Sequence, residues 1–203
     1  MKIVRVETLL SRGPYSGSKG WRTTRDALHR AIRQVSWPPG SEKFTIYPES
    51  GKKRGQGNGV KPIKEGLMVA LARVGWKLEH RLDFATAKKP GKLDAVLQSA
   101  HGPVALEWET GNISSSHRAL NKMSLGLLKG KLAAGVLIVP SRKLYKYLTD
   151  RVGNIDEIDP YLDLWRSIPY PQGVLEVVVV EQDAESLDVP RISKRTDGGR
   201  ALA

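Results

Sequence analysis

The chain has 203 residues, enough for one domain with a sizeable hydrophobic core, and 33 Lys and Arg against 21 Asp and Glu give a formal net charge of +12. A field of that sign favours a polyanionic partner, with nucleic acid ahead of a membrane surface. The absence of cysteine excludes disulfides and thiolate metal sites, and neither a signal-peptide core nor an apolar run of about 18–20 residues is present, so we expect a reducing cytoplasm.

The first half of the chain predicts two helices and several short strands. Residues 21–36 have the pattern of a basic amphipathic helix, which the prolines after Trp37 terminate. Residues 44–47 predict a short strand, and the Gly-rich, cationic segment 50–59 predicts a mobile loop. A second helix is expected over 62–74, with its proline near the first turn. Three strands follow, near residues 76–83, 92–99 and 103–110.

The second half predicts a helix over 115–129, with Ser114 to Ser116 as candidate N-caps. The continuous apolar run 132–140 is typical of a strand that is covered on both faces. Two helices and a last strand are then expected at 141–151, 154–167 and 174–182. The polar tail is expected to form a flexible arm over about residues 184–203. Strands flanked by helices on both sides indicate one α/β domain, spanning 1–203, with a mixed central sheet.

Two acids on an apolar strand are the most informative feature of the sequence. Glu107 and Glu109 are separated by one residue, so both side chains are expected on one face of the strand. Asp94, in the preceding strand, is a third acid that follows a Pro/Gly turn. Three converging carboxylates repel one another unless a cation lies between them, and such oxygen ligands suit Mg²⁺. The arrangement predicts a metal-dependent phosphodiesterase.

Each acid has an expected role in such a site. Asp94 and Glu107 would hold one ion between neighbouring strands, and the carbonyl of Trp108 would add a ligand. Glu109 would orient or deprotonate the attacking water. Glu79, one strand earlier, is a candidate ligand for a second ion about 4 Å away. The alternative interpretation is a solvated face for the paired acids, a surface charge for Glu79 and a packing role for Trp108.

Two polar segments are candidates for reading DNA. The first follows the acids directly at a strand-to-helix junction and contains Asn112, Ser114, Ser116, Arg118, Asn121 and Lys122. Helix N-termini attract phosphate, and these side-chain types contact bases and phosphates, but polar residues at this position are also ordinary helix caps. The second segment contains Asp150 and Arg151, which together have the donors and acceptors to read a G·C pair. A structural pair at a helix end is the alternative.

Three segments of the sequence resemble the BamHI family of type II restriction endonucleases: ETGNISSSHRALNKMSLGL, PIKE and LTDRV. The resemblance extends with gaps from about Trp37 through the tail, and the ETGNISS block is highly specific. Its third catalytic position is Glu109 where nucleases of the wider class carry lysine, a departure that this family shares. The resemblance implies a restriction-endonuclease-like fold with a mixed sheet between helices.

The resemblance also implies roles for individual residues. Glu79, Asp94 and Glu107 would bind metal, with Glu109 as the general base. The residues implied at the DNA are Asn112 and Ser114 at the inner bases, Arg118 nearby, Asp150 and Arg151 at the outer G·C pairs, Lys64 close to the DNA, and Asp197 in a tail that enters the minor groove. The cofactor would be Mg²⁺, two ions per site, with Mn²⁺ as a substitute.

The family resemblance further implies a bacterial cytoplasmic enzyme that binds double-stranded DNA as a homodimer. It would cut the palindrome GGATCC after the first G and leave GATC overhangs, while a separate DNA methyltransferase protects the host. The segments 117–129 and 141–151 are candidates for the dimer surface, or are ordinary core helices. Two rival classes are a catalytically inactive, sequence-specific DNA-binding protein on the same fold and a ribosomal or chromatin-type basic protein.

Overall fold

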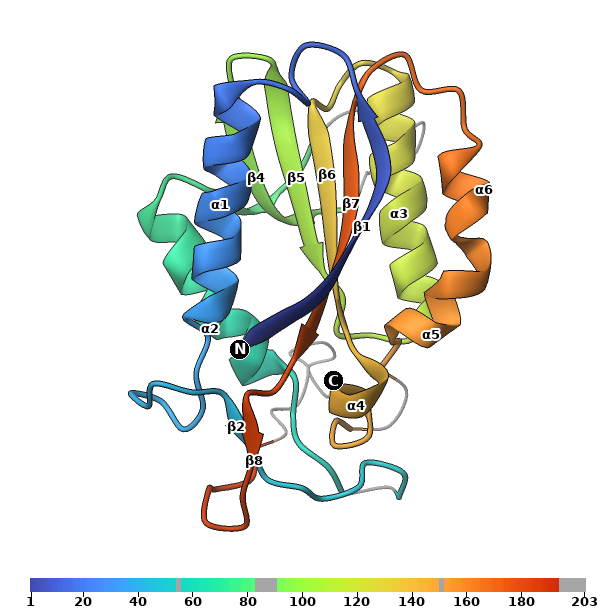
Figure 1. The fold of residues 1–203 in the computed structure, drawn as a ribbon. Helices are drawn as coiled ribbons and strands as arrows, with labels where there is room; N and C mark the ends of the chain where they lie inside the picture. Colours follow the sequence, from blue (N-terminus) through green and yellow to red (C-terminus); the bar gives the residue numbers. More distant parts are fainter. Residues whose placement is uncertain (54–55, 83–90, 150–151, 194–203) are drawn as a thin grey trace, which may run out of the picture.

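A computed structural model describes residues 1–53, 56–82, 91–149 and 152–193 of the chain. A six-stranded mixed sheet forms its centre, in the order β1-β7-β6-β5-β4-β3 (Figure 1). The strands of this sheet are β1 (Lys2–Arg12), β3 (Lys77–His80), β4 (Leu93–Ser99), β5 (Gly102–Trp108), β6 (Ala134–Pro140) and β7 (Gly173–Glu181). Strands β5, β6 and β7 run parallel, whereas the β1–β7, β3–β4 and β4–β5 pairs are antiparallel.

Helices cover both faces of the sheet (Figure 1). One face carries α1 (Lys19–Arg33) and α2 (Lys61–Arg73). The opposite face carries α3 (Ile113–Leu128), α5 (Ile155–Ile158) and α6 (Leu162–Arg166), with the 3-10 turn η1 (Asp159–Tyr161) between the last two. Below the sheet lie α4 (Arg142–Tyr145) and the parallel pair β2 (Thr45–Ile46) with β8 (Ala184–Glu185). The predicted α/β fold with a mixed sheet between helices is confirmed.

The core consists of two apolar layers, one on each side of the sheet. Alternate residues of the buried strand β7 enter different layers: Val178 packs on the α1 and α2 side, and Val177 and Val179 pack on the α3 side. All seven residues of β6 are buried, as expected of a strand covered on both faces. Within the described part of the chain, no helix is long and apolar enough to cross a membrane.

Strand β1 was not predicted, and its register explains why. It pairs with β7 along the sheet edge, but the pairing shifts between Ile3 and Arg5 and again between Thr8 and Leu10. Each shift interrupts the two-residue alternation by which a half-buried strand is recognised. Leu9 and Leu10 are consequently buried in succession, 5% and 8% exposed.

Two predicted helices were too long. Of the segment 141–151, the described residues 141–149 contain only the four-residue α4, because the chain then turns and Leu148 forms a β-bridge with Asn58. The segment 154–167 is divided into α5, η1 and α6, with Pro160 in the 3-10 turn. Proline has no amide hydrogen for a continuous helix, so the division follows from its presence.

The tail differs from the expected flexible arm in its first part. Residues of β8 pair with β2, and the Trp37 indole donates a hydrogen bond of 2.7 Å to the carbonyl of Pro190. Ile192 is fully buried, and its amide donates to the Asn58 side chain. The tail is therefore attached to the domain at least as far as Ile192. Residues 194–203 lie outside the described part of the chain.

Candidate active site

Asp94 and Glu107 lie side by side where the β4–β5 ladder ends. The last paired residues on this side are Ala95 and Leu106. One position further, the Asp94 amide donates to Glu107 Oε2 at 3.2 Å, and the Trp108 amide donates to Asp94 Oδ2 at 2.8 Å. The carboxylates thus replace backbone carbonyls as acceptors, and the two strands fix them next to each other. The predicted pairing of these two acids is present in the structure.

Burial makes Glu107 an unusual carboxyl group. Its residue is only 9% exposed, and this burial is the main reason why its pKa is raised. Repulsion from Asp94 raises the pKa further, while the ammonium group of Lys122 opposes both effects. A carboxylate in such surroundings gains more from a bound cation than an exposed carboxylate does.

Two lysines approach the acids from opposite faces of the sheet. Lys64 of α2 places Nζ 2.6 Å from Asp94 Oδ1, and Lys122 of α3 places Nζ 2.6 Å from Glu107 Oε1. Lys122 also donates to the carbonyl of Lys92 at 3.0 Å. Both lysine side chains are largely buried, 24% and 18% exposed. The expected DNA residue Lys64 is therefore engaged with the acidic pair.

Glu109 lies just beyond β5 and is half-buried. Its amide continues the sheet by donating to the carbonyl of Ile138 at 3.1 Å, and its Oε1 accepts the Gly111 amide at 2.7 Å. Burial is the principal cause of a raised pKa, and the negative charge of Asp94 adds to it. Glu109 is thus held by the chain that follows it, within the electrostatic influence of Asp94.

The donor chemistry of Asp94, Glu107 and Glu109 fits a hard divalent cation, because all three offer carboxylate oxygens. Among the described residues, however, no three His, Cys, Asp or Glu side chains come together as a metal-binding group. Glu79 takes no part in these contacts. Its side chain is 61% exposed and forms an ion pair with Lys92 at 3.7 Å, and its backbone φ is 48°. Trp108 packs its buried side chain in the layer beneath α1 and α2.

The start of α3 presents the first predicted DNA-reading segment. Asn112 is the N-cap, and its side chain accepts the Ser115 amide; the serines that were the expected caps lie inside the helix. Ser114 and Arg118 are exposed on the first turns, and Arg118 donates to the Ser115 hydroxyl at 3.2 Å. These side chains are accessible to a ligand, and their placement is compatible with either expected role.

The second predicted segment, Asp150 and Arg151, lies outside the described residues, as does Asp197 of the tail. Gly153, which follows this second segment, lies close to the first segment. The Gly153 amide donates to the carbonyl of Gly111 at 2.8 Å, and a Cβ on Gly153 would lie 3.1 Å from the Cα of Ile113.

Sequence reasoning missed the role of Lys122, which it grouped with the DNA-reading residues. A signal was present in the helical spacing. Lys122 follows the buried Ala119 by three positions and precedes the buried Gly126 by four, so it lies on the inner side of α3. A cation on the inner side of a helix needs a buried anion, and Glu107 is that anion.

Comparison with known proteins shows the family to which the chain belongs. Residues 1–199 match the family described as restriction endonuclease BamHI. The chain belongs to the BamHI family of restriction endonucleases. It is 46% identical over 198 residues to the type II restriction enzyme OkrAI of Oceanobacter kriegii, covering 98% of each chain. Against the type II restriction enzyme BamHI of Bacillus amyloliquefaciens it is 36% identical over 169 residues, covering 80% of this chain and 75% of the relative.

Membership of the BamHI family makes the chain a type II site-specific deoxyribonuclease. The match extends to the first residue, further than the resemblance recognised from Trp37 onward. Among solved structures, the restriction endonuclease BglII complexed with a DNA 16-mer matches with a TM-score of 0.65 and 8% identity. That match covers 90% of this chain and 79% of BglII and supports the fold alone.

Proposed function

We propose that this restriction endonuclease is a homodimer that hydrolyses double-stranded DNA at GGATCC, cutting after the first G and leaving GATC overhangs, with Mg²⁺ as cofactor. The single observation that carries the catalytic part is the contact between Asp94 and Glu107, two adjacent carboxylates where β4 and β5 separate. The family match supports the class of reaction. The ETGNISS block, shared by resemblance, supports the target.

In this proposal Asp94 and Glu107 hold the metal, with a second ion nearby for which Glu79 is the candidate ligand and with Mn²⁺ able to substitute. The Trp108 carbonyl is a further candidate ligand. The bound ion would lower the pKa of a water molecule and neutralise charge on the phosphate. Glu109 would accept the proton of the attacking water as the general base.

Specificity is proposed to come from the two segments that Gly111 and Gly153 connect. Asn112 and Ser114 would read the inner bases, with Arg118 nearby at the start of α3. The outer G·C pairs would be read by Asp150 and Arg151, because arginine can bind guanine through two hydrogen bonds and aspartate can accept from cytosine. Asp197 would enter the minor groove with the tail.

A palindromic target requires two half-site readers related by a two-fold axis, hence the proposed homodimer. The outer side of α3, η1 and α6 is the candidate surface. It exposes large apolar side chains: Leu128 at 40%, Tyr161 at 49% and Leu164 at 60%. The other candidate is the segment 141–151, whose described residues, 141–149, contain only the short helix α4. In a bacterial cytoplasm such an enzyme requires a methyltransferase that modifies the same sequence in host DNA.

The test is a digest of a plasmid with one GGATCC site, in Mg²⁺ and in EDTA, followed by sequencing of the ends. Linear DNA in Mg²⁺ alone, with GATC overhangs, is the expected product. Linear DNA cut at another sequence would overturn the proposed target and leave the metal-dependent reaction intact. Tight binding to GGATCC without cleavage would instead favour the inactive DNA-binding protein.

A further inference from the structure

Every carboxylate oxygen of the acidic pair already has a hydrogen-bond donor. On Asp94, Oδ1 accepts from Lys64 and Oδ2 accepts from the Trp108 amide. On Glu107, Oε1 accepts from Lys122 and Oε2 accepts from the Asp94 amide. A divalent cation can therefore bind these oxygens only by displacing donors or by sharing their acceptors.

The four donors differ in how easily they are displaced. The two amides belong to β4 and β5, and moving them would separate strands that are paired from Ala95 and Leu106 onward. The two ammonium groups end long side chains, which can rotate away without moving the backbone. Electrostatic repulsion also favours displacement of the ammonium groups over the amides, because a divalent cation repels an ammonium group a few ångströms away.

We propose that Lys64 and Lys122 are exchangeable counter-ions that neutralise Asp94 and Glu107 in the free protein and leave them when metal binds. This inference rests on the proposed metal-dependent function and concerns the order in which metal and DNA bind. In the protein without DNA, the lysines compete with the metal, so metal binding is weak.

DNA can supply the anion with which each displaced lysine pairs. Their side chains are only 24% and 18% exposed, so an ammonium group that loses its carboxylate is poorly solvated and needs another anion. A DNA phosphate is an anion of that kind, and lysine is a common phosphate ligand. DNA therefore strengthens metal binding, and metal strengthens DNA binding by the same factor.

The experiment is a calorimetric titration of the DNA-free protein with Mn²⁺. Lys122→Met and Lys64→Met keep much of the side-chain volume and remove the competing charge. We expect each variant to bind Mn²⁺ about tenfold more tightly than the wild type. In thermal denaturation, millimolar Mn²⁺ should then raise the Tm of the variants more than that of the wild type.

Two further variants separate local competition from general charge. Lys19→Met removes one positive charge at an exposed position of α1 and should leave Mn²⁺ affinity unchanged. Lys122→Arg keeps the positive charge and should bind Mn²⁺ as weakly as the wild type. Circular dichroism spectra and urea midpoints identify any variant that does not fold, in which case the other lysine and the Arg variant carry the comparison.

The outcomes distinguish this inference from the proposed function. If the wild type cleaves DNA with Mg²⁺ while the folded Lys→Met variants bind Mn²⁺ no more tightly than it does, the lysines are not competitors and the inference is wrong. If the wild type neither cleaves DNA in Mg²⁺ nor binds Mn²⁺ in the presence of DNA, the metal site itself is wrong and the inference falls with it.

Discussion

Asp94 and Glu107 each use a carboxylate to bind the strand that carries the other. Glu107 accepts the Asp94 amide, and Asp94 accepts the amide of Trp108, next to Glu107. The same contacts that end the β4–β5 ladder therefore bring two negative charges together. Lys64 and Lys122 compensate that repulsion, so the two acids can lie side by side without a bound cation.

Replacing Asp94 with asparagine tests the metal site most directly. The amide side chain has nearly the same shape and can still accept the Trp108 amide, but it has no charge for a cation or for Lys64. We expect Asp94→Asn to lower the cleavage rate by roughly 10³-fold or more, with sequence-specific binding retained. The measurement is single-turnover cleavage beside a gel-shift assay.

The matched control is Asp188→Asn, which makes the same chemical change in an exposed turn. It should cleave at the wild-type rate. Cleavage by Asp94→Asn at that same rate would show that Asp94 is not a metal ligand.

Gly111→Ala is expected to damage catalysis with little effect on stability. A Cβ at this position would lie 2.9 Å from Glu109 Oε1 and 3.1 Å from Ser115 Oγ. Because Oε1 ends a flexible side chain, the fold can adjust, but Glu109 is displaced from the place where the Gly111 amide holds it. We predict a fall in kcat of about 10–100-fold, with a urea midpoint close to that of the wild type.

Gly17→Ala is the control for this change, because a Cβ there meets nothing within 4 Å. It should leave both kcat and the urea midpoint unaltered. A Gly111→Ala variant with normal kcat would argue against Glu109 as the base.

Sequence patterns predicted the central elements well where burial is simple. The runs that became β4 to β7 and α3 were located to within a few residues, because a covered strand has a short continuous apolar run and an amphipathic helix has apolar residues at helical spacing. The adjacency of Asp94 and Glu107 followed from two acids on apolar strands. The unpredicted features depend on tertiary contacts: the shifts of register that obscure β1, and the helix packing that brings Lys64 and Lys122 to the acids.

Asn58 is predicted to be a major source of stability below the sheet. It is fully buried, and its side chain donates to the carbonyls of Tyr47 and Tyr147 and accepts the Ile192 amide. Asn58→Ala would remove these three hydrogen bonds and leave the buried Ile192 amide without its acceptor, whereas the carbonyls of Tyr47 and Tyr147 keep the backbone amides of Glu49 and Asn58 as donors. We expect a loss of about 2–4 kcal/mol in the free energy of unfolding, measured by urea denaturation.

The exposed Gln172 offers a comparison, since Gln172→Ala also shortens an amide side chain. That variant should unfold at the wild-type urea concentration. An Asn58→Ala variant that did the same would show that water satisfies the groups Asn58 now binds.

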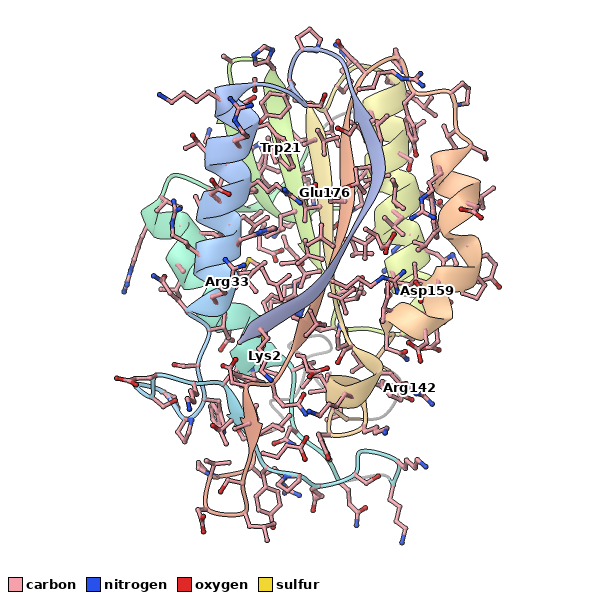
Figure 2. The ribbon with its side chains drawn as sticks, viewed as in Figure 1. Lys2, Trp21, Arg33, Arg142, Asp159 and Glu176 are labelled. Carbon is pink, nitrogen blue, oxygen red and sulfur yellow. The ribbon has the colours of Figure 1, made fainter. Side chains whose placement is uncertain are left out.

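Glu176 is a buried carboxylate in the middle of the apolar strand β7, separate from the group of Asp94, Glu107 and Glu109. Its side chain is 4% exposed and lies between the strands and α1, where Arg25 approaches to 3.1 Å (Figure 2). Burial raises the pKa of Glu176, and Arg25 counteracts that rise. A carboxyl group with a raised folded-state pKa costs stability as the pH rises through that value.

Arg25→Met should therefore destabilise the protein more near pH 8 than near pH 5. Without the guanidinium group the pKa of Glu176 rises further, and a larger share of the carboxyl group is ionised and buried without a counter-ion at pH 8 than at pH 5. Because Arg25 is 38% exposed, we expect a loss of only about 1–3 kcal/mol at the higher pH. Urea denaturation at both pH values measures it. Adding Glu176→Gln should restore most of the loss, and a pH-independent loss would mean that Arg25 acts through packing alone.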